Sequence, residues 1–405
     1  MRTPTWCVAL SMLCIGTAAS SQTVLSEADA LARLSADSPR VRAIRAAVEL
    51  ARADVLTAAR WPNPRVTFNR ESVAGITENM VTVTQPLPIS GRRGLEVSAA
   101  SALAGASASR ANEDIRQARA ELRLAYADLV ATQVREAEQV RSRERLRGLA
   151  DVLGRREAAG ESAGYDRLRA EREVADVESA IADARARRLR AQGTVASFFT
   201  DAGDITALVA AVPPPATTAL PDVDQLLSRA ETVRGDWAAL RQEIDASRLS
   251  ERAADRRLVP DPEVVAGTKS SNTAGGDVGS VVSVHVAVPL FDRGSPERAM
   301  ARARRSQAES RVESLRASLR AQIAATRAEV VERRDAAGRY RAASSDIDRL
   351  ERIAQVSYEA GERGILELLD ALRSGSVARA RQAELDAAAR RAEIELEFLS
   401  GWEIR

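Results

Sequence analysis

The sequence predicts a mainly α-helical fold of long coiled helices that also carries membrane β-strands, whose sheet closes into a β-barrel only when several copies assemble. Three observations predict this fold class: a duplicated pattern along the chain, two long zones without proline, and two strand pairs beside prolines. The composition agrees, because the 405 residues are 45% hydrophobic but only 3% aromatic. Ala, Leu and Val must then fill the core, which is typical of long helices and coiled coils.

The duplication rests on three motifs that occur twice in the same order, at spacings of 198, 203 and 201 residues. The motif pairs are RWPNPRVTF (60–68) with RLVPDPEVV (257–265), TQPLPISG (84–91) with AVPLFDRG (287–294), and EAAGESAGYDRL (157–168) with YEAGERGILELL (358–369). We therefore expect two structural repeats. The expected segments are a signal peptide at 1–20, a first repeat at 21–212 with a strand pair at 64–86 and a long helical hairpin at 92–198, a linker at 213–222, and a second repeat at 223–405 with a strand pair at 263–288 and a hairpin at 295–399.

The proline-free zones predict the long helices. No proline occurs from 89 to 212 or after 296, and an interior proline costs a helix about 3 kcal/mol. Apolar and small residues recur in these zones at alternating steps of three and four, as at Ile115, Ala118 and Leu122. This heptad-like seam predicts helices that pack closely side by side.

The strand pairs show alternation of apolar and polar residues. Val81 and Val83 alternate with threonines, and valines alternate with polar or small residues over 282–288. The strands are near the roughly 9–11 residues that a membrane strand needs, and the polar loops SVAGITE and SSNTAGGD join them. A soluble hairpin packed on helices is the alternative, but the flanking helices leave no obvious cover for two strand pairs. Four strands are too few for a membrane barrel, which starts at about eight, so the chain must oligomerise.

Prolines and glycines bracket the strand pairs, and we interpret them as the junction between the barrel and a helical tube. Prolines stop a β-ladder, and glycines let the chain turn and restart as helix. In the second copy, Ser295 is expected to cap the helix and Pro296 to be its first residue. The junction residues are Pro62, Pro64, Pro86, Pro88, Gly91, Pro260, Pro262, Pro289 and Gly294.

The first 22 residues have the pattern of a secretory signal peptide: one arginine, an apolar run and a small-residue end. Both cysteines, Cys7 and Cys14, lie inside it, and the residues before Cys14 lack the small side chains expected before a lipidated cysteine. No later run of 18 apolar residues exists, so membrane insertion must use strands.

Catalytic and metal-binding patterns are missing from the sequence. The net charge of +2 comes from interspersed charges, which argues against a nucleic-acid partner. His285 is the only histidine, no cysteine cluster exists, and the serines lack a histidine for a triad. The sequence therefore predicts no enzyme, no cofactor and no metal site.

This organisation resembles the TolC family of outer-membrane efflux proteins over essentially the whole chain after the signal peptide. Both strand pairs, QPLPISGRRG, VPLFDRG and both hairpin motifs carry the resemblance, and QPLPISGRRG looks most like the CzcC-like heavy-metal efflux subgroup. The resemblance implies a homotrimer with a twelve-stranded barrel in the outer membrane and a helical tunnel across the periplasm. It also implies a passive exit duct that works with a periplasmic adaptor and an inner-membrane RND-type pump for heavy-metal cations.

The resemblance assigns site residues at the periplasmic end of the tunnel. Glu367 and Asp370 match acidic rings at the constriction, with Glu367 where the family usually has aspartate. Tyr358 and Arg363 match positions that tether one hairpin to its neighbour, and Asp166 matches their partner. The hairpin turns, which also contact the adaptor, are Gly160, Gly164, Gly361 and Gly364. Two carboxylates spaced i, i+3 share a helix face, and three copies about an axis would attract cations.

Three alternatives stay open. A periplasmic adaptor would carry one long hairpin flanked by several small β-domains. An exit duct could instead serve drugs or other organic compounds. A secreted coiled-coil protein would explain the signal peptide but not the repeated strand pairs.

Overall fold

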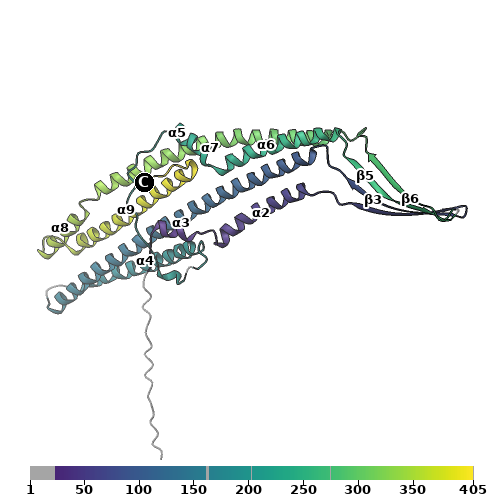
Figure 1. Cartoon of the computed structure of the whole chain (residues 1–405). Helices are drawn as coiled ribbons and strands as arrows, with labels where there is room; N and C mark the ends of the chain where they lie inside the picture. Colours follow the sequence, from purple (N-terminus) through teal and green to yellow (C-terminus); the bar gives the residue numbers. More distant parts are fainter. Residues whose placement is uncertain (1–22, 161–163, 202, 274, 405) are drawn as a thin grey trace, which may run out of the picture.

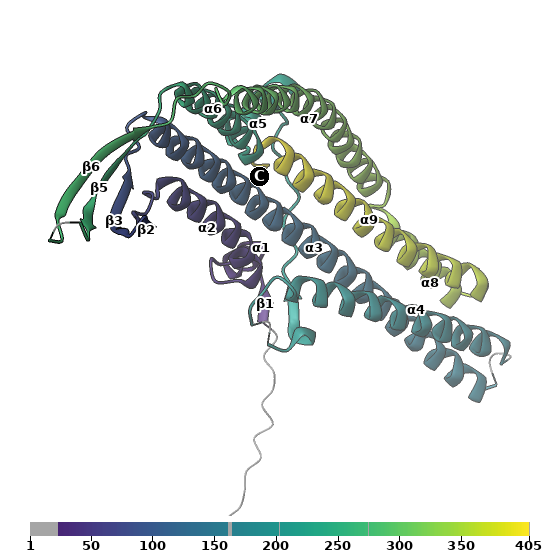
Figure 2. The ribbon, with the colours of Figure 1, turned by 90° about the vertical axis from the view of Figure 1, so that its right-hand side faces the viewer.

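The chain is elongated, with helices along most of its length and a β-sheet at one end (Figure 1). The computed structural model describes residues 23–160, 164–201, 203–273 and 275–404. The predicted signal peptide at 1–20 lies outside the described residues. The helical hairpins end at the far side of the molecule from the sheet (Figures 1 and 2).

The first half of the chain follows the predicted order of helix, strand pair and long hairpin. Helix α3 runs without a break over 67 residues, about 100 Å at 1.5 Å per residue. The elements of this half are β1 (Thr23–Leu25), α1 (Glu27–Arg33), α2 (Pro39–Ala59), β2 (Arg65–Val73), β3 (Ile76–Pro86), α3 (Arg92–Ala158), α4 (Tyr165–Ala196), a 3-10 turn (Ile205–Ala207) and β4 (Leu208–Ala210).

The second half has the same order, but its hairpin is divided. The elements are α5 (Val223–Val233), α6 (Gly235–Asp255), a 3-10 turn (Arg256–Leu258), β5 (Pro262–Ser271), β6 (Val278–Val286), α7 (Ser295–Ala343), α8 (Ile347–Glu359) and α9 (Ile365–Ser400). Two serines and an aspartate separate α7 from α8, and the Ser345 hydroxyl donates to the Ala342 carbonyl at 2.9 Å. Such side chains compete with helical hydrogen bonds, which explains a break without proline.

The helix start in the second half corrects one expectation. Gly294, not Ser295, is the N-cap of α7, with a left-handed φ of 73°, and Pro296 is therefore the second helical residue. A Cβ on Gly294 would collide with the Ala254 carbonyl oxygen. Close approach of α6 and positive φ thus both require glycine at this position.

The four predicted strands form one antiparallel sheet in the order β2-β3-β5-β6. Strand β3 of the first half pairs directly with β5 of the second, from Glu78 opposite Ser271 to Pro86 opposite Glu263. The turn between β2 and β3 is only Ala74 and Gly75, both with positive φ, so the strands extend into the predicted loop SVAGITE. The outer edges of β2 and β6 have no partner strand among the described residues.

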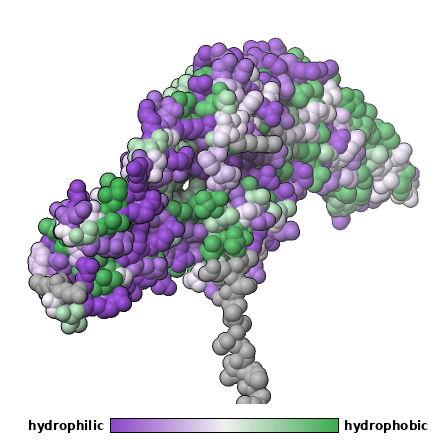
Figure 3. Space-filling view, turned by 90° about the vertical axis from the view of Figure 1, so that its left-hand side faces the viewer, coloured by the Kyte–Doolittle hydropathy of each residue, from purple (hydrophilic) through white to green (hydrophobic). Residues whose placement is uncertain are grey.

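One face of this sheet is apolar and exposed. The register places Val66 opposite Val83 and Phe68 opposite Val81, and continues across the sheet to Val282 and other valines of β6. Phe68 is 63% and Val282 76% exposed. Hydrophobic surface gathers over this end in the space-filling view, whereas the helical part is mostly hydrophilic (Figure 3).

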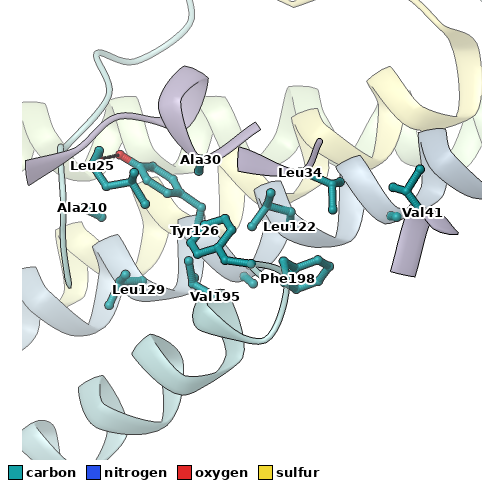
Figure 4. Close-up of a cluster of buried hydrophobic side chains, with 13 residues drawn as sticks. Leu25, Ala30, Leu34, Val41, Leu122, Tyr126, Leu129, Val195, Phe198 and Ala210 are labelled. Atoms are coloured by element: carbon teal, nitrogen blue, oxygen red, sulfur yellow. Dashed lines mark hydrogen bonds between the residues drawn. The ribbon is translucent and has the colours of Figure 1, made fainter. Parts of the chain in front are cut away.

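The largest apolar cluster fixes the middle of α3. Its side chains lie between α3, the end of α4 and the N-terminal segment, where β1 pairs in parallel with β4 (Figure 4). Tyr126 is 2% exposed, and its hydroxyl lies 2.9 Å from the Leu25 carbonyl and 2.7 Å from that of Ala211. These elements cover one face of α3, and α9 pairs with α3 through Arg135 with Glu384 and Arg391 with Asp128.

Within the described ranges, no helix contains a stretch that is both long and apolar enough to cross a membrane.

Candidate functional site

The ends of the two hairpins meet around a small apolar cluster. Leu146 and Leu153 of α3, Ala170 of α4, and Ile365 and Leu368 of α9 are buried against one another. These side chains recur at helical spacing and face inward, so the tips of both hairpins are held as one unit.

The structure brings two of the three predicted tether residues together. The Tyr358 hydroxyl donates to Asp166 Oδ2 at 3.4 Å, across the two hairpins. The Arg156 guanidinium lies over the Tyr358 ring at 6.0 Å from its centroid. Burial and the nearby Asp166 carboxylate raise the pKa of Tyr358, so the phenol is the donor at neutral pH.

Arg363 does not join this pair within the chain. It lies in the turn between α8 and α9, where its backbone N–H donates to the Ser357 carbonyl at 3.2 Å. Its side chain is exposed and has no ion pair with another described residue. The described part of the chain therefore offers Arg363 no tether partner.

The two predicted gate carboxylates lie side by side on the first turns of α9. Glu367 and Asp370 are exposed. By contrast, Ile365, Leu368 and Leu369 of the same turns are buried in the apolar cluster where the two hairpin ends meet, called the tip cluster below. The carboxylates thus point away from the hairpin core. Neither forms an ion pair with another described residue, so both negative charges are available to solvent or to an ion.

The four predicted turn glycines divide into two kinds. Gly160 and Gly361 have φ of 76° and 75°, so a left-handed conformation requires glycine at both. Gly164 and Gly364 are the N-caps of α4 and α9, with negative φ, and lie in the same connecting segments as Gly160 and Gly361. Residues 161–163 of the first turn lie outside the described residues.

The predicted junction residues of both halves meet at the base of the sheet. The Leu87 N–H donates to the Pro262 carbonyl, and the Ser90 N–H to Asp261 Oδ1, both at 2.8 Å. The Pro62 carbonyl accepts from Gln85 Nε2 at 3.1 Å. Gly91 is the N-cap of α3, with φ of 78°, as Gly294 is the N-cap of α7. Pro64, Pro88, Pro260 and Pro289 lie in the chain segments between these contacts and the neighbouring strands and helices. The junction therefore joins the two halves to each other as well as sheet to helix.

The sequence analysis did not predict a buried ionic cluster that lies between α8, α9 and α3. Glu351 is 8% exposed, accepts from Arg379 at 2.6 Å and from Arg145 of α3 at 2.9 Å, and lies against Gly375 of α9. No local motif marks these residues, since only the fold brings them together.

No group of three or more histidine, cysteine, aspartate or glutamate side chains in the described part of the chain is arranged to hold a metal ion.

Comparisons with known proteins identify the fold. Residues 226–402 match the family model described as outer membrane efflux protein, and no curated protein matches the chain. Similar solved structures include a membrane protein from Pseudomonas aeruginosa (TM-score 0.75, 18% identity), CusC (0.74, 16%) and the outer-membrane channel OprN (0.72, 20%). The matches cover 93% of this chain each time, and 93%, 92% and 89% of the other chains.

These findings confirm the predicted fold class, and the match to a family of efflux proteins agrees with the prediction of a non-enzymatic protein. The chain has the TolC-like fold of long helices with a small sheet, and its second half matches the outer membrane efflux family.

Proposed function

We propose that the chain is the outer-membrane exit duct of a tripartite efflux system, formed as a homotrimer. The single observation that carries this proposal is the open four-stranded sheet, which has two unpartnered edges and an exposed apolar face within the described residues. Unpaired edges require a partner strand, and an exposed apolar face requires a cover. Three copies that pair β6 with β2 of the next chain, with lipid against the valines, meet both needs.

The helical part supports the same assembly. Helices α4 and α8 lie at opposite sides of the hairpin layer, and both expose large apolar side chains. Tyr165 and Leu168 of α4 are 61% and 58% exposed, and Leu350 and Ile353 of α8 are 53% and 54% exposed. Pairing these edges between neighbouring chains would close the layer into a tube and bury them.

An adaptor is supported less well. Between residues 23 and 404, the described elements include two long hairpins and one shared four-stranded sheet, rather than one hairpin with several β-domains. The assembly places the sheet in the outer membrane and the helices in the periplasm, after export by the predicted signal peptide. The adaptor and an inner-membrane pump are then separate partners.

We also propose that the two halves, 21–212 and 223–405, are copies of one duplicated unit.

The assembly can be tested with cysteines, because the only natural ones are Cys7 and Cys14. Phe68→Cys on β2 is combined in turn with Ser280→Cys, Val282→Cys or Val284→Cys on β6. Oxidation of the detergent-extracted protein should give a covalent trimer for at least one pair, and each single variant is the control. Monomers from every pair, in a sample with normal helical content, would contradict edge-to-edge closure.

The finer proposal concerns the cargo. Heavy-metal cations and an RND-type pump are supported by QPLPISGRRG and by the free carboxylates Glu367 and Asp370. The Glu367→Ala, Asp370→Ala double variant should weaken block of the channel by divalent cations, since three copies of each charge would be lost. Block equal to that of the unaltered channel would place the constriction elsewhere. Organic cargo is the second candidate, and a basic groove between α3, α4 and α9 favours it.

A further inference from the structure

A groove of about 580 Å³ lies between α3, α4 and α9. Its α3 residues Asp128, Ala131 and Arg135 lie about 100–180° around the helix from Leu122 and Leu129, and Ala125 belongs to both the groove and their apolar cluster. The N-terminal elements cover the side of Leu122 and Leu129, so the groove opens on the other face of the helical layer. In a tube with those elements outside, this face lines the lumen.

The groove has more basic than acidic side chains. Its four arginines are Arg135, Arg187, Arg190 and Arg391, and its two acids are Asp128 and Glu384. Both acids are already neutralised within the chain, because Arg135 contacts Glu384 at 3.0 Å and Arg391 contacts Asp128 at 3.3 Å. Arg381 of α9 also forms an ion pair with Glu384 at 3.1 Å.

Two guanidinium groups therefore remain unpaired. Arg187 and Arg190 are exposed on α4, and neither forms an ion pair with any residue in the described ranges. Each carries several N–H donors in a planar fork that matches a carboxylate or sulfonate. The free positive charge lies at the α4 side of the groove.

The rest of the surface is small and apolar. Five alanines line the groove: Ala125, Ala131, Ala191, Ala380 and Ala383. Short side chains leave a shallow floor on which a flat apolar body can lie, and the volume is in the range of roughly 300–1,000 Å³ of small-molecule sites. An inorganic anion would bind the arginines but would gain nothing from the apolar surface of the alanines.

We propose that this arginine groove binds organic anions that combine a flat apolar body with a carboxylate or sulfonate. The proposal rests on the proposed duct, since it names a class of cargo that the lumen would hold. Glu384 follows Asp370 by 14 residues on α9, about 21 Å along the helix. The lumen would thus pass from an acidic constriction to three arginine grooves, one from each chain.

The test uses isothermal titration calorimetry to measure the binding of 2-naphthalenesulfonate to the full-length protein in detergent. Arg187→Gln and Arg190→Gln should each weaken binding about tenfold, because each removes a charge-assisted donor. The matched control is Arg185→Gln, an exposed arginine two residues from Arg187 and on roughly the opposite side of α4. This control should bind as the unaltered protein does.

Two results would overturn the proposal. Equal loss of binding in the Arg185→Gln control would mean non-specific attraction to a basic helix. Inorganic sulfate binding as tightly as 2-naphthalenesulfonate would mean that the alanine floor takes no part.

The groove lies within one chain, so binding can be measured whether or not the protein forms a channel. Binding without conductance would contradict the proposed duct but not the proposed binding site in the groove. Conductance without binding would contradict the groove alone.

Discussion

The two long hairpins share one architecture but are anchored differently. In the first, α3 is continuous from Arg92 to Ala158, and a large apolar cluster with Tyr126 fixes its middle. In the second, the corresponding leg is broken after Ala343, and the short helix α8 has a single buried residue, the carboxylate Glu351. Apolar burial thus fixes the middle of one hairpin, whereas the only fully buried contact of the detached segment of the other is ionic, beside the partly buried Ala354 and Tyr358.

This difference has consequences for stability. Apolar contacts are non-directional and survive small shifts, whereas a buried carboxylate that loses its arginines keeps a large desolvation cost. Glu351 depends on Arg379 of α9 and Arg145 of α3. We therefore expect α8 to respond more sharply than α4 to single substitutions.

The largest expected effect comes from Gly375→Ala. The added methyl group would collide with the Glu351 carboxylate and force it away from Arg379. We expect α8 to lose about 2 kcal/mol of local stability. Hydrogen–deuterium exchange of the α8 amides measures this directly.

The control for that substitution is Gly193→Ala in α4, where a new Cβ would have no neighbour within 4 Å. Alanine stabilises a helix interior by roughly 0.5–1 kcal/mol relative to glycine, so the control should protect α4 slightly. Unchanged protection of α8 in Gly375→Ala would mean that ion pairs do not hold this helix.

A somewhat smaller effect is expected from Tyr126→Phe in the first hairpin. The change leaves the Leu25 and Ala211 carbonyls without the phenol donor, at a cost of about 1–2 kcal/mol. Exchange protection should fall around β1 and β4, while α8 stays unaffected. Loss of protection in α8 instead would show that the two anchors are coupled.

Tyr126 also makes the stability of the first hairpin depend on pH in the alkaline range. Burial, aided by the Glu27 carboxylate, raises the pKa of Tyr126 from 10.0 to about 12. A raised phenol pKa means that the folded state holds its proton more tightly, so this stabilisation is complete below pH 10 and is lost as the pH rises to about 12. Tyr126→Phe should remove this part of the pH dependence, and an unaltered alkaline profile would contradict it.

The smallest effect is expected where the hairpins touch. Tyr358→Phe removes a long hydrogen bond to Asp166 on a partly exposed surface, worth about 0.5 kcal/mol. Because the apolar tip cluster remains, the hairpins should stay together and open only slightly more often. A modest rise in conductance of the reconstituted protein is expected, and a fall would argue against a tether.

Much of this fold follows from local signals in the sequence. Prolines at 62, 64, 260 and 262 mark where strands begin, and the proline-free zones contain the long helices. Positions such as Gly91 need a backbone conformation that few other residues adopt, so the residue type alone marks them as turning points of the chain.

Other features depend on contacts between distant segments. The pairing of β3 with β5 joins the halves into one sheet, and neither strand's sequence specifies which strand it pairs with. The break before α8 has no proline or glycine to mark it. The Glu351 cluster and the arginine groove each draw on three helices, so their charges look like ordinary solvated faces in the sequence.

We propose above all that several copies of this chain form a channel. Single-channel conductance of the detergent-extracted protein in a planar bilayer, with the oligomeric mass of the same sample, tests it most directly. We expect a trimer with a small, cation-selective conductance that divalent cations block. A monomer without conductance would contradict channel formation, because a sheet with two open edges would then have no partner.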